Sequence, residues 1–255
     1  MVTGQRAAAA RRDVPRVSPA RLRTRRVDRR TVLRVAMCLV ALAVIFANSW
    51  AWQRTPEPVP PSGSALEALE TLTILASTPT RVADYDRDAF GSAWQDVDDN
   101  GCDTRNDILA RDLERFAYAD ERSACVIRTG ILEDPYTGTT IEFVRGVRTS
   151  AAVQIDHVVA LGDAWSKGAA AWDAETREVF ANDPLNLVAT DGQTNSTKGS
   201  RDAAEWLPPA EAYRCPYVAR QIAVKATYEL AVTSDELAAM RDVLASCPAE
   251  PLPVG

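Results

Sequence analysis

The chain has 255 residues, a formal net charge of −6 and 46% hydrophobic residues, which is enough for one sizeable folded domain with appendages. The charge is unevenly distributed. Residues 1–34 contain 11 arginines, no lysine and two aspartates, which gives them a net charge of +9. The rest of the chain must therefore carry a net charge of −15 for the total to be −6. Such an acidic remainder argues against broad binding of nucleic acid over a basic surface. The two parts of the chain therefore serve different purposes.

Residues 1–34 show no apolar period, and we expect a disordered, basic cytoplasmic tail. The next segment, 35–52, is 18 residues long and begins with the apolar run VAMCLVALAVIFA. This is near the lower limit for a membrane-spanning helix, and the preceding arginines place its N-terminal end in the cytoplasm. Two alternatives remain: an uncleaved anchor, which the long tail favours, or a signal peptide cleaved near Ala47 and Ser49. In either case the rest is exported, anchored to the plasma membrane or secreted.

A proline-rich linker follows over 53–63, and a single folded domain is expected over 64–249, with a short tail at 250–255. The exported part has an even number of cysteines, Cys102, Cys125, Cys215 and Cys247, which is typical of two disulfides. The sequence permits three pairings, and we favour the local one, Cys102–Cys125 and Cys215–Cys247.

Apolar spacing and turn residues predict an α+β domain. The stretch S-A-L-E, from Ser64 to Glu67, has the capping-box pattern and predicts a helix over 65–76. Further helices are expected over 106–118, in one or two pieces within 163–182, from 196 to 207, over 217–230, and over 234–246 with Ser234 as its cap. Strands are expected over 139–146, 153–161 and 185–190.

The stretch QIDHVVAL, residues 154–161, contains the only histidine of the chain. An isolated histidine in an apolar run is more often a core residue than a catalytic one. Neighbouring strand residues point to opposite faces, so Asp156 and His157 reach one site only near a strand end or a bulge. Asn186, Asn195 and Lys198 follow at fixed spacings. The oxygen of Asn195 suits either a hard cation or a helix N-cap.

The pair D-H followed by NLVATDGQTNSTKG resembles the HNH endonuclease family, and within it the branch that includes the C-terminal domain of GmrSD-type restriction enzymes and exported actinobacterial proteins. Members of the same branch contain sequence segments similar to NGCDTRNDILARDL, DPYTG, QIDHVVALGDAW, NDPLNLVATDGQTNSTKGSRDAAEWLPP and YRCPYVARQIAVKATYEL. The resemblance covers much of residues 96–247. It implies a ββα-metal core embedded in a mostly helical domain.

The resemblance also implies a role for each site residue. His157 is the general base that activates water, and Asp156 and Asn195 hold one divalent cation. Asn186 is structural and positions the loop of His157. Lys198 contacts a phosphate, or else is a solvated helix charge. Many members have histidine where this chain has Asn195, and two oxygen ligands favour Mg²⁺ or Mn²⁺ over Zn²⁺.

These inferences predict an exported, metal-dependent endonuclease that hydrolyses phosphodiester bonds in DNA, with RNA left open. Arg145, Arg148, Lys198 and Arg201 are candidates for a local basic rim. The alternative is a catalytically silent binding module on the same scaffold. No protein partner follows from the sequence. The stretch DVDDNGCDTRND, 96–107, nearly fits a calcium loop but has Asp107 in place of the bidentate glutamate, and an acidic surface turn is the preferred interpretation.

Overall fold

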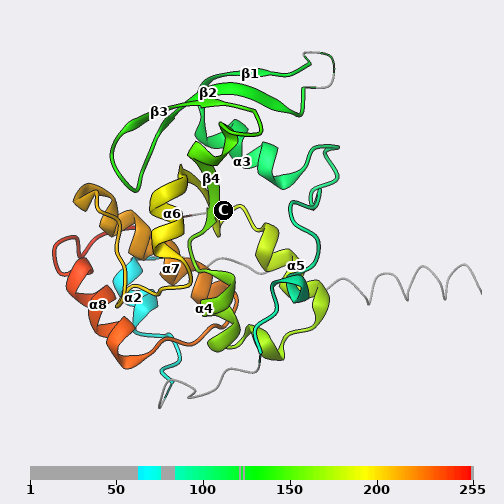
Figure 1. The fold of residues 1–255 in the computed structure, drawn as a ribbon. Coiled ribbons are helices and arrows are strands. Elements are labelled where there is room, and N and C mark those ends of the chain that lie inside the picture. The colour runs from blue at the N-terminus through cyan, green and yellow to red at the C-terminus, as the bar shows by residue number, and fades with distance from the viewer. Residues whose placement is uncertain (1–62, 76–83, 121, 123, 254–255) are drawn as a thin grey trace, which may run out of the picture. The chain divides into compact units, whose positions relative to one another are not determined.

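The computed structural model describes residues 63–75, 84–120, 122 and 124–253 (Figure 1). The basic tail and membrane segment expected over 1–52, and the linker up to residue 62, lie outside the described residues. The chain divides into two units, 1–57 and 58–255, and the described residues all belong to the second. Among its described helices none is both long and apolar enough to cross a bilayer.

The second unit combines short helices with two small antiparallel sheets, which is the expected α+β class (Figure 1). The α-helices are α2 (Ala65–Leu69), α3 (Thr104–Asp112), α4 (Leu161–Ser166), α5 (Ala174–Asn182), α6 (Gly192–Lys198), α7 (Arg214–Thr227) and α8 (Ser234–Leu244). The strands are β1 (Glu114–Tyr118), β2 (Ile127–Glu133), β3 (Thr140–Val144), β4 (Val153–His157) and β5 (Leu187–Asp191). Short 3₁₀ helices are η1 (Arg87–Phe90), η2 (Ser150–Ala152), η3 (Ala169–Ala171) and η4 (Glu211–Tyr213).

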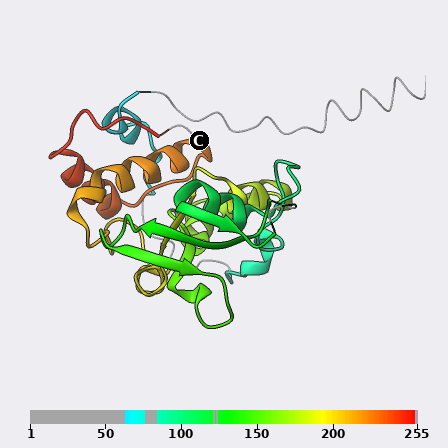
Figure 2. The ribbon, with the colours of Figure 1, turned by 90° about the horizontal axis from the view of Figure 1, so that it is seen from above.

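Strands β1, β2 and β3 form one antiparallel sheet, and β4 and β5 form another, in which Asp156 is paired with Val188 and His157 with Leu187. Helix α3 lies between the two sheets (Figures 1 and 2). Helices α4 and α5 are inserted between β4 and β5, and α6 follows β5 directly. Strand, strand and helix thus form a compact unit although 29 residues lie between the first strand and the second.

Two apolar clusters enclose this unit. Ile155 of β4 belongs to the cluster formed by α3 and the sheets. Val158 and Val159, which follow the strand, belong to the larger cluster of the helices α2, α4, α5, α7 and α8. The end of β4 is therefore held by two cores, and side chains at this position have little freedom to move.

Two predicted helices are shorter than expected. The capping box at Ser64 and Glu67 is formed, but α2 ends at Leu69 and the chain extends so that Ile74 makes a bridge with Val232. The helix predicted over 106–118 ends at Asp112, and the residues ERFAY form β1 instead. The aromatic residues of this stretch pack on β2, which the sequence did not predict, and this tertiary pairing overrides the local helical pattern.

The helix expected from 196 to 207 begins earlier and ends earlier, at Lys198. The Asp191 side chain accepts the N–H of Thr194 at 2.7 Å and caps α6, and Gly199 follows with φ of +56°, a left-handed conformation that ends the helix. Thr233, not Ser234, caps α8. The expected tail also begins later than residue 250, because Ala65 N donates to the Glu250 carbonyl and Leu252 is buried.

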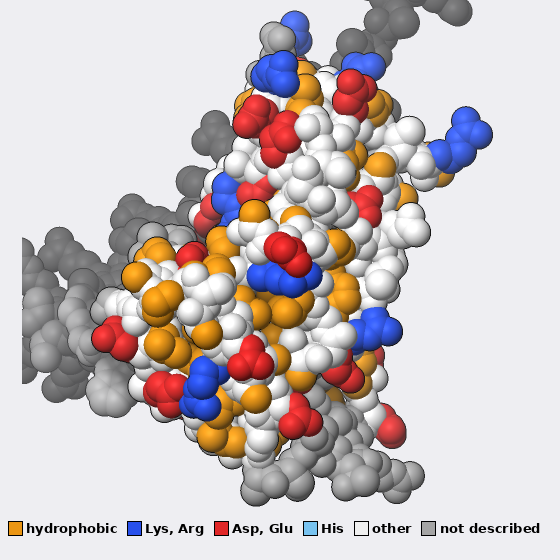
Figure 3. All heavy atoms as spheres, turned by 90° about the vertical axis from the view of Figure 1, so that its left-hand side faces the viewer, with side chains coloured by type: hydrophobic (Ala, Val, Ile, Leu, Met, Phe, Trp, Pro, Cys, Tyr) orange, Lys and Arg blue, Asp and Glu red, His pale blue; other side chains and the backbone are white. Residues whose placement is uncertain are grey.

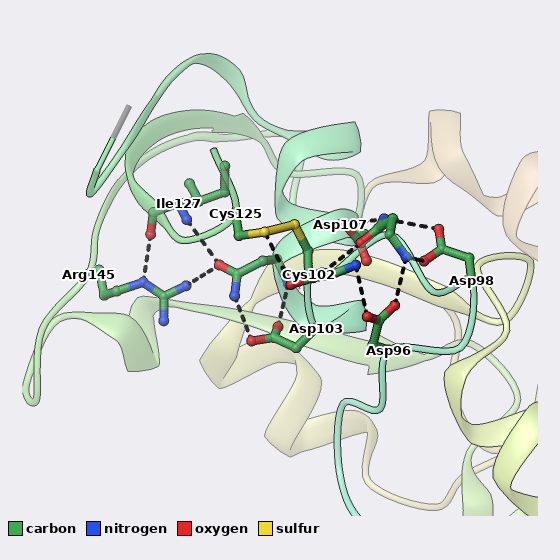
Figure 4. The surroundings of a disulfide bond; sticks show 11 residues. Asp96, Asp98, Cys102, Asp103, Asp107, Cys125, Ile127 and Arg145 are labelled. Carbon is green, nitrogen blue, oxygen red and sulfur yellow. Dashed lines mark hydrogen bonds between the residues drawn. A yellow bond between two sulfur atoms is a disulfide. The ribbon is translucent and has the colours of Figure 1, made fainter. Parts of the chain in front are cut away.

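The disulfides are Cys102–Cys125 and Cys215–Cys247, the sequence-local pairing. The first connects the segment before α3 to the segment before β2 (Figure 4). The second connects the start of α7 to the chain just after α8. Each closes a loop of moderate length around one of the two apolar clusters and so restricts the unfolded chain.

Candidate active site

The site is built where β4 faces α6. Because side chains alternate along a strand, Gln154 and Asp156 share one face of β4, and both reach α6. Gln154 Oε1 accepts a hydrogen bond from Asn195 Nδ2 at 3.0 Å, and Asp156 Oδ1 lies 3.1 Å from Lys198 Nζ. The spacing of three residues between Asn195 and Lys198 is one helical turn, so the two polar contacts lie one above the other.

Asp156 is buried, and both of its carboxylate oxygens have protein donors. Tyr136, from the turn between β2 and β3, donates its hydroxyl to Oδ2 at 2.6 Å, and Lys198 approaches Oδ1. Burial raises the pKa of Asp156, while the charge of Lys198 and the two hydrogen bonds act in the opposite direction. Each oxygen keeps a second lone pair, so the carboxylate retains capacity for a further ligand.

Lys198 is fully buried. Its ammonium lies between Asp156 Oδ1 and the carbonyl of His157, which it reaches at 2.8 Å. The expected contact of Lys198 with a phosphate does not fit this placement, because the ammonium faces the carboxylate and not solvent. A lysine in this position fixes the backbone of His157 relative to the Asp156 side chain.

His157 is the last residue of β4, which meets the condition for two neighbouring residues to reach one site. Its Nε2 lies 2.8 Å from the Ala181 carbonyl, and a carbonyl oxygen only accepts, so Nε2 is the protonated nitrogen of the neutral ring. Within the described part of the chain Nδ1 has no hydrogen-bond partner and keeps its lone pair. Burial lowers the pKa of His157 to about 4. The value is below the ordinary one for histidine because desolvation disfavours the imidazolium.

Asp156, His157 and Asn195 line a single cavity of about 300 Å³. A second cavity, of about 90 Å³, also has His157 in its wall together with Trp94 and Ala181. The indole of Trp94 lies nearly parallel to the imidazole, at 12° and 6.2 Å between ring centroids. The imidazole thus lies in the wall of both cavities, and the hydrogen bond to Ala181 and the stacked indole of Trp94 hold it in place.

Asn186 is fully buried and makes both of its amide hydrogen bonds with one residue. Its Oδ1 accepts from the Val159 N–H at 2.8 Å, and its Nδ2 donates to the Val159 carbonyl at 3.2 Å. Its own carbonyl accepts from the Val158 N–H. The side chain therefore fixes the turn that follows His157 and leaves no polar atom for a ligand.

The oxygens of Asp156 and Asn195 suit a hard divalent cation. The hydrogen bond of Asn195 Nδ2 to Gln154 leaves Oδ1 without a partner in the described part of the chain, and both residues line the larger cavity. One carboxylate and one amide oxygen are donors that Mg²⁺ or Mn²⁺ prefers. A different cluster, Cys215, Cys247 and Glu250, brings three ligand atoms close together, but its sulfurs form a disulfide and are not available to a metal.

The acidic stretch 96–107 forms a hydrogen-bonded surface turn (Figure 4). Its aspartates accept from Asn100, whose Nδ2 donates to Asp98 Oδ2 at 3.0 Å and to Asp107 Oδ1 at 3.2 Å. Asn100 Oδ1 accepts from the Cys102 N–H at 2.7 Å. Nearby, Arg145 donates to the Ile127 carbonyl at 2.6 Å, so this arginine holds the end of β3 to β2.

Four residues of the site have no counterpart in the sequence prediction. Gln154, Tyr136, Trp94 and Arg87 contact or border the predicted trio. The alternation of β4 places Gln154 on the face of Asp156, a signal that the sequence contains. The other three lie 20 or more residues before Asp156, and only the tertiary fold brings them to the site.

The described residues form an α+β domain in which Asp156, His157 and Asn195 line one cavity, and the family match makes this domain nuclease-related. Residues 103–243 match the family described as GmrSD restriction endonucleases, C-terminal domain, and the chain belongs to this family. A protein of Arthroderma benhamiae described as an uncharacterized secreted protein is 35% identical over 210 residues, which is 81% of this chain and 98% of the relative. No solved structure matches the chain.

Proposed function

We propose that this protein is an exported, metal-dependent endonuclease of the HNH type, in which β4, β5 and α6 form the ββα-metal core. The observation that carries the proposal is the single cavity lined by Asp156, His157 and Asn195, with the Nδ1 lone pair of His157 unengaged. Membership in a family of restriction-endonuclease domains supports the same class of reaction. The substrate is nucleic acid, with DNA favoured over RNA.

His157 acts as the general base. Its neutral ring accepts a proton at Nδ1 from a water molecule, and the resulting hydroxide attacks the scissile phosphorus. The Nε2 hydrogen bond to the Ala181 carbonyl fixes the tautomer and becomes stronger when the ring is protonated, because the donor then carries a positive charge. Trp94 holds the ring plane. The low pKa keeps the base unprotonated at neutral pH.

Asp156 and Asn195 would hold one Mg²⁺ or Mn²⁺ through oxygen. When bound, this cation supplies positive charge for the phosphate and the leaving oxygen. Tyr136 and Lys198 orient the Asp156 carboxylate, Gln154 orients the Asn195 amide, and Asn186 fixes the turn after His157. In this account Lys198 is a positioning residue.

The domain works outside the cytoplasm. Two disulfides and a relative described as secreted support this location. Segment 35–52 then serves as a membrane anchor or as a cleaved signal, after the basic tail 1–34 and before the linker 53–63. Sequencing of the mature N-terminus distinguishes the two.

The test is cleavage of supercoiled plasmid and of a structured RNA by the full chain in Mg²⁺, Mn²⁺ or EDTA. We expect nicking of the plasmid in either metal and none in EDTA. Asn195→Ala should shift the metal dependence to higher concentration, whereas Gln193→Ala, an exposed change on the same helix, should not. A chain that binds nucleic acid but cleaves neither substrate in any metal would leave the binding module as the better account.

A further inference from the structure

A phosphodiester is an anion, but the acidic domain offers few cations at the candidate site. Lys198 is buried against Asp156, and Arg145 is bound to the backbone of β2. On the face drawn in Figure 3, the arginines and lysines of the described residues are scattered singly among acidic side chains and form no continuous basic patch. A substrate phosphate therefore needs a positive charge from another part of the chain.

Arg87 is placed to supply that charge. It is exposed, and it lines both cavities that have His157 in their walls. Among the residues that line the larger cavity it is the only arginine or lysine. Arg87 precedes the region 103–243 that matches the family, so the family match does not assign it a role.

The backbone that presents Arg87 is fixed. Phe90, at the end of η1, is 2% exposed, and its ring lies 6.2 Å from that of Phe180 and 6.0 Å from that of Trp165, measured between centroids. Arg177 donates to the Ala89 carbonyl at 2.8 Å. One turn of 3₁₀ helix is thereby anchored in the helical core, and Arg87 extends from it beside the cavity.

We propose that Arg87 is a substrate-binding residue that contacts the phosphate positioned beside His157, and that Tyr85, which lines the same cavity and is 41% exposed, borders the adjacent sugar or base. The proposal deepens the proposed function and rests on it for the choice of substrate. A guanidinium suits this role because its fork of N–H groups matches two phosphate oxygens and it stays charged at every relevant pH.

The experiment is binding of a fluorescent double-stranded DNA oligonucleotide to the full chain over a range of salt concentrations, in the His157→Ala background so that no cleavage occurs. Arg87→Ala is compared with Arg128→Ala, which removes the same charge from an exposed position on β2 outside the cavity. We expect Arg87→Ala to weaken binding about tenfold and to reduce the salt slope by about 0.9, the value for one lost phosphate contact. Arg87→Lys should retain most of the slope.

Equal affinities and slopes for the Arg87→Ala and Arg128→Ala proteins would overturn the proposal, as would a parent protein with no measurable binding. Failure of the endonuclease proposal gives a different pattern: the wild type cleaves nothing, yet Arg87→Ala still lowers affinity and slope. Arg87 is exposed, so a thermal midpoint equal to that of the parent is expected and separates loss of binding from loss of fold.

Discussion

His157 Nε2 lies 2.8 Å from the carbonyl oxygen of Ala181, and this contact fixes the orientation and tautomer of a buried imidazole. The ring loses solvent without gaining a carboxylate partner, and its pKa falls from 6.5 to about 4. The unfolded chain therefore binds one more proton than the folded chain between these two pH values.

The first prediction concerns stability against pH in EDTA. The contribution of the neutral His157 ring to the free energy of unfolding is fully present above pH 6.5. It is lost as the pH falls from 6.5 to about 4, because the unfolded chain takes up the proton more readily than the folded chain. The loss amounts to about 3 kcal/mol. Urea unfolding of the wild type and of His157→Gln checks it. The difference between the two stabilities should change through this pH window, and a constant difference would contradict the buried neutral ring.

The second prediction concerns Asn186. Asn186→Asp keeps an acceptor for the Val159 N–H but places an anion against the Val159 carbonyl, so the turn after His157 should open. We expect cleavage to fall by about 100-fold and stability by about 3 kcal/mol. Both are measured on purified protein, by nicking rate and by urea unfolding. Retention of full activity by this variant would show that the turn does not position the base.

The third prediction concerns a buried ion-pair network. Lys167 Nζ lies 2.5 Å from Asp163, 2.7 Å from Asp202 and 2.6 Å from Glu236, all in the interior between α4 and α8. Lys167→Met leaves these carboxylates with one cation fewer, and it should lower the free energy of unfolding by about 3–5 kcal/mol.

The matched control is Arg241→Met, which removes the exposed ion pair with Glu70 and should cost less than about 1 kcal/mol. Denaturant unfolding of both variants gives the comparison. Similar costs for the two would mean that burial of the network contributes nothing to its strength.

The fourth prediction concerns Gly192, the first residue of α6. A Cβ at this position would lie 2.0 Å from the backbone oxygen of Ala151, so Gly192→Ala must displace either α6, which bears Asn195, or the η2 backbone against which it packs. The exposed Gln193→Ala, one residue further on, is the control. We expect Gly192→Ala to lose both stability, by about 2–4 kcal/mol, and cleavage, while the control keeps both. Thermal unfolding measures the loss of stability, and the plasmid nicking rate over a Mn²⁺ titration measures the loss of cleavage.

The sequence predicted the strands of the site because β4 and β5 are dense in β-branched and apolar residues with turn residues between them. The capping box at Ser64 was also readable, since both partners lie within one turn. It did not predict β1, because ERFAY continues an apolar helical spacing and becomes a strand only through its pairing with β2.

The spacing of Asp156, His157 and Asn195 predicted residues that the fold brings to one cavity. The surroundings of each of these side chains could not be predicted from the sequence. The burial of Lys198 and the lowered pKa of His157 depend on which residues cover them, and Tyr136, Trp94 and Arg87 arrive from distant segments.

The most direct test of the account is the single-turnover rate of cleavage of end-labelled DNA in Mg²⁺ by the wild type, His157→Ala and His157→Gln. General-base catalysis contributes about 10²–10⁴-fold, so both variants should be slower by at least about 100-fold while their affinity for the DNA stays close to that of the wild type. Equal rates for the three proteins would contradict the assignment of His157 as the base.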